Sequence, residues 1–252
     1  MTQVVEYFPT RDLETMSAAR NYIEWTLRRL VLPHLGARVL EIGAGIGNYS
    51  AGMLADARVE SLTAIEIDAR CADEWRRAFA NIDGDKKTSL IGRDYMDVEL
   101  APGSFDSIVC LNVLEHIVDD VRAVQKAYDA LTPGGRFVVY VPAFPLLLGA
   151  IDERLGHVRR YTKASATPLF QNAGFRLRAM RYYNFAGFVG WLIRFCVLRK
   201  DHQDPGVVGV FDRWIQPVQA YLEEWTPWQP LGQSLLIVAE RPVEALPCGK
   251  ID

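Results

Sequence analysis

The first half of the chain alternates between short apolar runs and longer segments whose apolar residues recur at helical spacing. The apolar runs predict buried strands, and the segments between them predict helices. Five strands are expected, at Arg38–Ile42, Ser61–Ile65, Ser89–Ile91, Phe105–Leu111 and Arg136–Val141. Three helices are expected, at Tyr49–Ala55, Arg70–Ala80 and Asp119–Leu131. Apolar strands with helices between them indicate a parallel sheet that is covered on both faces.

The two ends of the chain add elements to this alternating core. Residues 12–31 carry apolar side chains three and four positions apart, which predicts an N-terminal helix. The pattern changes after Pro142, and further strands are expected at Phe175–Tyr183 and Ser234–Ala239. Residues 185–230 are rich in aromatic side chains and predict a helical insertion between the last two strands.

Composition narrows the classes of partner. The 252 residues carry a formal net charge of -3 rather than the excess of basic residues typical of nucleic-acid-binding proteins, so no nucleic-acid partner is expected. The four cysteines form no C-x-x-C pair, which argues against a zinc site or a disulfide framework and favours a cytoplasmic location. No signal-peptide pattern is visible in Met1–Asp12. The apolar run Phe185–Ile193 is shorter than the roughly 20 residues that span a bilayer, so no stable membrane insertion is expected.

A glycine-rich turn follows the first strand. Gly43, Gly45 and Gly47 lie in the run Glu41-Ile42-Gly43-Ala44-Gly45-Ile46-Gly47-Asn48. Glycines admit positive φ and let a ligand approach the backbone closely. In an open α/β sheet, the crevice beyond the strand ends is the expected ligand site. The run therefore predicts a cofactor loop, and the alternative is a tight turn without a ligand.

The second strand ends in a carboxylate that suits a ribose. Glu66 lies 19 residues after Gly47, where two carboxylate oxygens can accept the two ribose hydroxyls. Asp68 is an alternative, although it is better placed to cap the next helix. The spacing G-x-G-x-G differs from the nicotinamide fingerprint G-x-G-x-x-G, and Glu41 beside the loop disfavours a pyrophosphate. A cofactor with a ribose and a positively charged sulfur fits better, and a nicotinamide-dependent oxidoreductase is the alternative.

The run from Glu41 to Gly47 resembles the first motif of the class I S-adenosylmethionine-dependent methyltransferases. Further resemblances follow in order at Gly92–Tyr95, Asn112–Ile117 and Leu131–Phe137. The resemblance is strong over residues 38–141 and weaker over 157–183. It implies S-adenosylmethionine as the cofactor and S-adenosylhomocysteine as the product. The implied cofactor-binding residues are Glu41, Gly43, Ala44, Gly45, Gly47, Glu66, Ile67, Asp94, Tyr95, Asn112 and Val113.

The resemblance also implies a fold: a Rossmann-like, doubly wound sheet of seven mostly parallel strands with an antiparallel last strand. We expect one domain with five parts. They are an N-terminal helical cap (1–36), a cofactor-binding core (37–142), a substrate-side segment and strand (143–184), a helical lid (185–230), and the last strand with its tail (231–252). The stretch from Gly92 to Ser104 is too short for the helix found there in the family. An Asn-Pro-Pro-Tyr type loop is absent after the fourth strand, which argues against a DNA substrate.

Three residues are candidates for catalysis. Transfer to a hydroxyl or a carbon acid requires a base, and His116 follows the strand-four loop near the expected methyl group. His157 and Tyr161 lie in Gly156–Thr162, which resembles a stretch common in bacterial small-molecule methyltransferases. For each the alternative is a packing role, and the two arginines of the stretch are equally compatible with surface ion pairs. Of the other histidines, His34 and His202 read as turn and loop residues, and no metal ligands are expected.

The aromatic residues of the insertion are expected to cover a small-molecule substrate, which favours a hydrophobic or aromatic acceptor. They also fit a second small core. A third interpretation is that Phe185–Leu198 dips into a membrane surface to reach a lipid-linked acceptor. A protein that binds the cofactor without catalysis stays open. The sequence fixes neither the oligomeric state, for which a homodimer is one alternative, nor whether O, N or C is methylated.

Overall fold

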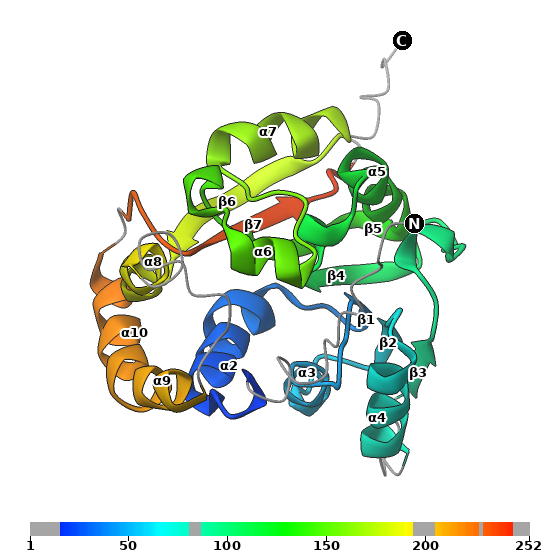
Figure 1. Cartoon of the computed structure of the whole chain (residues 1–252). Helices are drawn as coiled ribbons and strands as arrows, with labels where there is room; N and C mark the ends of the chain where they lie inside the picture. Colours follow the sequence, from blue (N-terminus) through cyan, green and yellow to red (C-terminus); the bar gives the residue numbers. More distant parts are fainter. Residues whose placement is uncertain (1–15, 81–86, 194–204, 227–228, 244–252) are drawn as a thin grey trace, which may run out of the picture.

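Seven strands form one sheet in the order β3-β2-β1-β4-β5-β7-β6 (Figure 1). The computed structural model describes residues 16–80, 87–193, 205–226 and 229–243. The strands are β1 (Arg38–Ile42), β2 (Ser61–Ile65), β3 (Lys87–Ile91), β4 (Phe105–Leu111), β5 (Leu131–Pro142), β6 (Arg176–Tyr183) and β7 (Ser234–Glu240). The first five pair in parallel, while β7 is antiparallel to both β5 and β6. The predicted fold is confirmed, including the antiparallel last strand.

Helices cover both faces of the sheet. They are α2 (Arg20–Thr26), α3 (Ser50–Ala55), α4 (Ala69–Phe79), α5 (Asp120–Ala130), α6 (Ala150–Leu155), α7 (Lys163–Asn172), α8 (Phe185–Trp191), α9 (Pro205–Val210) and α10 (Gln216–Trp225). α5 and α7 lie on one side of the sheet, and α2, α3 and α4 lie on the other (Figure 1). Within the described part of the chain, no helix is both long and apolar enough to cross a membrane.

The double cover explains why consecutive residues of the central strands, such as Ile108–Leu111 of β4, are apolar. In β4, Ile108 and Cys110 belong to the core beneath α5 and α7. Val109 and Leu111, which alternate with them, belong to the core beneath α2 and α3. Successive strand residues face opposite sides of a sheet, so both sets are buried. This two-sided burial holds the carboxyl ends of β1, β2 and β4 at one edge, where the glycine-rich turn lies.

The N-terminal helix α2 begins at Arg20 and continues through the π-helical turn Leu27–Val31, so it ends where its apolar pattern suggests but begins later. Residues 12–15 lie outside the described range, and a break at Ala18 and Ala19 separates α2 from the residues before it. The carboxylate of Asp212 accepts the backbone amides of Asn21, at 3.2 Å, and Tyr22, at 2.9 Å. A helix can begin where a side chain satisfies its first free N–H groups. Here a residue 190 positions away supplies that carboxylate, so the local sequence does not reveal the boundary.

The described residues between β6 and β7 are mostly helical, as predicted. α8 follows β6 directly, and α9 and α10 are joined by the π-helical turn Phe211–Ile215. These helices lie beside α2, at one end of the sheet (Figure 1). Residues of α2, α8, α9 and the turn after α9 form the roof of a large cavity.

Candidate functional site

A cavity of about 870 Å³ lies at the carboxyl ends of β1, β2 and β4. Its floor comes from the glycine-rich turn, the end of β2 and the turn after β4. Its roof comes from α2, α8 and the region of α9. Seven of the sequence-predicted cofactor residues line it: Gly43, Ala44, Gly45, Glu66, Ile67, Asn112 and Val113. His116 and His157 line it as well.

The glycine-rich turn, which forms part of the cavity floor, packs tightly against the ends of the strands. Gly43 has φ +72°, and a Cβ on it would lie 2.2 Å from Cγ2 of Val113, so no larger residue fits without rearrangement. The amides of Gly43 and Ala44 donate to the carbonyl of Ile65 at 2.8 and 3.1 Å. These contacts fix the turn against the end of β2. The next amide, that of Gly45, is left to bond a side chain.

Glu66 receives that amide. Its Oε2 accepts the Gly45 N–H at 2.7 Å, and its Oε1 accepts the Asp68 N–H at 2.8 Å. The side chain is only 8% exposed, and burial raises its pKa, although the two amide bonds oppose the shift. Each oxygen keeps a further lone pair as an acceptor. Asp68 itself accepts the amides of Arg70 and Cys71 and so caps α4, the role that the sequence favoured.

Two predicted cofactor residues support the floor from behind rather than lining the cavity. Glu41 is buried, and the hydroxyl of Ser50 donates to it at 2.5 Å. The indole of Trp75 donates in turn to that hydroxyl at 2.8 Å. Gly47 has φ +93°, and a Cβ there would lie 2.4 Å from Cε2 of Phe79. The first and last positions of the motif therefore serve the packing of α3 and α4.

Asp94 and Tyr95 do not line the cavity either. The Asp94 carboxylate accepts the amide of Met96 at 2.8 Å and caps the short turn Tyr95–Asp97. Tyr95 is buried in the core, where its hydroxyl donates to the carbonyl of Ala123 in α5 at 3.0 Å. Both side chains are therefore occupied by local structure, which the motif resemblance did not reveal.

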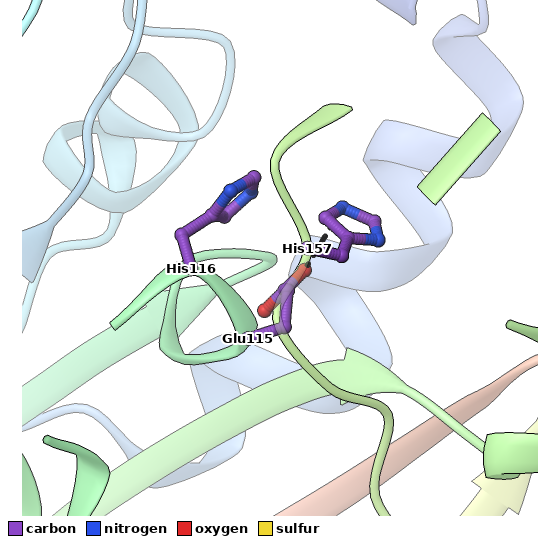
Figure 2. Close-up of side chains that lie close together, drawn as sticks. All are labelled: Glu115, His116 and His157. Carbon is purple, nitrogen blue, oxygen red and sulfur yellow. Dashed lines mark ion pairs between the residues drawn. The ribbon is translucent and has the colours of Figure 1, made fainter. Parts of the chain in front are cut away.

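A polar cluster lies among the residues that line the other end of the cavity. Glu115 and His116 belong to the turn Leu114–His116 after β4, and His157 follows α6; Figure 2 shows the three side chains gathered together. The two imidazole rings lie edge to face, with centroids 4.8 Å apart. Burial and the neighbouring His157 lower the pKa of His116 to about 4. Glu115 is fully buried, and burial raises its pKa to about 8.

Asp152 holds His157, and Arg160 holds Asp152; the sequence did not indicate this connection. Its Nδ1 lies 2.7 Å from Oδ1 of Asp152, and the guanidinium of Arg160 donates to both Asp152 oxygens, at 2.8 and 3.1 Å. Burial raises the pKa of Asp152, but the bonds from His157 and Arg160 outweigh it and leave the pKa below its usual value. Arg160 also lies over the ring of Trp191 at 4.7 Å. The only sequence signal for Asp152 is its position five residues before His157.

In the stretch from Gly156 to Thr162, some side chains face the cavity and others face Asp120 at the start of α5. Arg160 is buried at the cavity, whereas Arg159 pairs with Asp120. Tyr161 also donates to Asp120, at 2.9 Å, and does not line the cavity. Adjacent residues of an extended segment point to opposite sides. Of the three catalytic candidates, the structure therefore brings His116 and His157 together and leaves Tyr161 apart.

The two remaining histidines fall outside this cluster. His34 is half-buried at the end of the turn Leu32–His34 and does not line the cavity. His202 lies outside the described residues, as does the tail from residue 244. The sequence analysis expected no metal ligands, yet Glu115, His116 and His157 each offer a ligand atom, and these atoms all lie within 4.8 Å of one another.

Comparison with known proteins gives a family and several relatives. A family model described as a methyltransferase domain matches residues 12–179. The chain is 27% identical over 159 residues to a demethylmenaquinone methyltransferase of Clavibacter sepedonicus, covering 62% of this chain and 60% of that protein. It is 29% identical over 129 residues to a ubiquinone biosynthesis O-methyltransferase of Xanthomonas campestris pv. campestris, covering 50% of each. The matches thus span about half to three-fifths of these relatives' own length.

Solved structures share the fold. A putative methyltransferase of Haloferax volcanii, in complex with a Trm112 methyltransferase activator, superposes with a TM-score of 0.64 at 17% identity and covers 94% of this chain and 95% of that one. A phosphoethanolamine N-methyltransferase 2 of Haemonchus contortus in complex with S-adenosylmethionine gives 0.61 at 16% identity, covering 88% and 52%. The family match favours the methyltransferase prediction over the nicotinamide alternative.

The buried carboxyl of Glu41 generates a prediction about pH. Burial raises its pKa from the ordinary value of 4.5 to about 8, so the folded protein keeps a proton that the unfolded chain releases between these pH values. The free energy of unfolding therefore falls as the pH rises through this window. In Glu41→Gln this contribution is absent, so between pH 5 and pH 8 the variant should gain stability relative to the parent, on the order of a few kcal/mol. Urea denaturation at both pH values measures this, and parallel pH profiles would contradict the assignment.

Proposed function

Because the chain belongs to the methyltransferase-domain family, we propose that it transfers a methyl group from S-adenosylmethionine to a hydrophobic or aromatic small molecule in the cavity. The observation that carries this proposal is the fixed carboxylate of Glu66 at the cavity floor. It is held by the amides of Gly45 and Asp68 and keeps acceptor capacity toward the cavity.

The floor residues fit the adenosyl part of this cofactor. Glu66 accepts the two ribose hydroxyls, and such bonds to a charged group contribute about 1.5–3 kcal/mol each. Ile67 is exposed beside it and supplies an apolar surface for the flat base. Because Val113 lies against Gly43, no side chain fits at position 43, so the turn offers only its backbone to the cofactor there. No group of the floor is cationic, which suits a cofactor without phosphate.

The opposite part of the cavity fits an apolar acceptor. Ile23 of α2, Leu155 of α6 and Trp191 of α8 line it, together with Val207, Val208 and Phe211 from the roof. Ligand cavities of about 300–1,000 Å³ are usual for drug-sized molecules, so about 870 Å³ leaves room for a small acceptor beside the cofactor. The apolar roof excludes water from the reacting atoms.

When bound, the cofactor supplies a methyl group on a positively charged sulfur, which the acceptor takes by in-line displacement. The chain contributes mainly by holding both molecules, since orientation alone can lower a barrier by about 7–11 kcal/mol. The polar cluster of Glu115, His116 and His157 lies where an acceptor hydroxyl or amine would lose its proton. We also propose a cytoplasmic location, which the free, buried thiols of Cys71 and Cys110 support.

A second candidate function is methylation of a lipid-linked acceptor at a membrane surface. It is favoured by the reversed polarity of α10, whose side chains at Val218, Tyr221, Leu222 and Trp225 are exposed. The same helix and its preceding turn bury polar side chains instead, at Asp212, Gln216, Gln219 and Glu223. Apolar residues at this helical spacing, with Trp and Tyr among them, are typical of a surface that lies in a lipid interface.

The names of the relatives agree with this second candidate. Two of them act, by their names, in menaquinone or ubiquinone synthesis. Val207 of α9 both lines the cavity and is exposed, so apolar surface is accessible at this part of the roof. A lipid-linked acceptor would therefore reach the cavity along apolar surface.

Calorimetric titration tests the main proposal. The parent should bind S-adenosylmethionine with micromolar affinity, and Glu66→Ala should bind it at least tenfold more weakly, because the ribose hydroxyls lose their charged acceptor. Glu60→Ala, which removes an exposed carboxylate at the opposite end of β2, serves as the matched control and should bind as the parent does. Equal affinity of Glu66→Ala and the parent would overturn the ribose assignment. Stabilisation by NAD and not by S-adenosylhomocysteine would overturn the function.

Vesicle sedimentation tests the second candidate. The parent should sediment with phosphatidylglycerol–phosphatidylcholine vesicles, and a Trp214→Ser, Trp225→Ser double variant should bind them about tenfold more weakly, because the two indoles are 66% and 71% exposed on this face. Val121→Ser changes an exposed apolar residue on α5, away from the roof, and should leave sedimentation unchanged. A parent protein that stays in the supernatant would contradict a membrane-surface reaction.

A further inference from the structure

The polar end of the cavity brings together one carboxylate and two imidazoles. Glu115 and His116 are adjacent in one turn, and His157 reaches them from a segment about 40 positions later in the chain (Figure 2). His157 Nε2 lies 3.9 Å from Oε1 of Glu115, and the ligand atoms of all three residues lie within 4.8 Å of one another. Two imidazoles with one carboxylate form a ligand set found in catalytic transition-metal sites.

Glu115 gives an independent indication of a ligand. Its side chain is 0% exposed, and within the described part of the chain neither of its oxygens has a hydrogen-bond partner. Burying a carboxyl group without a hydrogen-bond partner is costly, so its presence at the cavity wall calls for a compensating group. The nearby guanidinium of Arg160 does not fill that role by contact, because it is committed to both oxygens of Asp152. A bound cation would supply the missing positive charge.

The surroundings of His157 are those of a metal ligand. Nδ1 of His157 is hydrogen-bonded to Asp152 at 2.7 Å, which directs Nε2 toward Glu115. Asp152 is itself fixed by Arg160 and by the amide of Gly149 at 3.0 Å. His116 lies beside Gly156, whose hypothetical Cβ would be 3.7 Å from its Nδ1. Metal-binding histidines nearly always use their second ring nitrogen as His157 does, because the bond fixes the ring and its tautomer.

We propose that Glu115, His116 and His157 bind one divalent transition-metal cation of the Zn²⁺ type at the acceptor end of the cavity. The inference rests on the proposed function and specifies its acceptor as a hydroxyl compound. Three protein ligands leave a coordination position for the acceptor oxygen. The cation would lower the pKa of that hydroxyl, whose proton would pass to water. The oxygen's electron pair would then form the O–CH3 bond while the S–CH3 bond breaks and its pair stays on the sulfur, which leaves S-adenosylhomocysteine.

The distances require only small movements. Ligand atoms about 2.1 Å from a tetrahedral cation lie roughly 3.4 Å apart. The separation of 3.9 Å between Glu115 and His157 therefore closes by about half an ångström, and the widest separation, within 4.8 Å, by up to about 1.4 Å. The charges also balance, since a divalent cation compensates both the Glu115 carboxylate and a deprotonated acceptor. Arg160 and Asp152 already compensate each other.

The test is a calorimetric titration of metal-depleted full-length protein with ZnCl₂, together with the visible absorption of bound Co²⁺. The parent should bind one equivalent of cation with micromolar or tighter affinity. Glu115→Gln and His157→Ala should each weaken binding at least tenfold, because each removes one of three ligands. Glu153→Gln, which alters an exposed carboxylate on α6, and His34→Gln, which alters a histidine outside the cavity, are the matched controls and should bind as the parent does.

A parallel titration with S-adenosylmethionine shows whether each variant is folded and separates the two proposals. Undiminished cofactor binding without saturable cation binding would overturn the metal site and leave the proposed function standing. Equal cation binding by the parent, Glu115→Gln and His157→Ala would also overturn it, since the cation would then lie elsewhere. Cation binding that depends on these residues, with no affinity for S-adenosylmethionine, would support the site and overturn the proposed function.

Discussion

The bond from the Gly45 amide to the Glu66 carboxylate joins the two strand ends on which the site depends. Gly45 follows β1 and Glu66 follows β2, and their contact at 2.7 Å closes the cavity floor. Ionising a carboxylate at 8% exposure is unfavourable, as its raised pKa indicates. The amides of Gly45 and Asp68 offset part of that cost and fix the orientation of the oxygens. The site is therefore preorganised, because little side-chain freedom remains to be lost when a ligand binds.

Polar contacts help to hold the roof, beside the apolar cluster in which Trp191 packs on Leu147 and Ile151. Asp212 binds the first amides of α2, and Glu223 accepts the amide of Asn184 at the start of α8, at 2.7 Å. Gln219 accepts the amide of Ala186 at 2.8 Å. Hydrogen bonds are directional, so these contacts fix how the roof helices lie against α2 and β6. With polar groups turned inward, the apolar side chains of α10 are left on the outside.

Local signals in the sequence were sufficient for the sheet and for the centre of the cofactor loop. The strands were visible because two-sided burial makes residues such as Ile108 and Val109 apolar together. Gly43, Gly45 and Glu66 were visible because positive φ and a carboxylate at a strand end leave a spacing pattern. Contacts between distant segments leave no such pattern, and the bond of Asp152 to His157 is visible only in the fold.

Some predicted site residues have side chains that lie away from the cavity, for a related reason. A motif position identifies a residue but not the side to which it points, and Tyr95 and Tyr161 both donate their hydroxyls away from the cavity. The exposed Trp214 and Trp225 were expected among residues covering a substrate, because large aromatic side chains are usually buried. The reversed polarity of α10 could be recognised only once the buried positions of Gln219 and Glu223 were known.

The central claim is that Glu66 holds the ribose of an adenosyl cofactor, and a crystal structure with S-adenosylhomocysteine measures this most directly. The account predicts electron density for the ligand above Gly43 and Gly45, with both ribose hydroxyls within about 3.2 Å of the Glu66 carboxylate. Density for the adenosyl group elsewhere, or a ribose out of reach of Glu66, would contradict it.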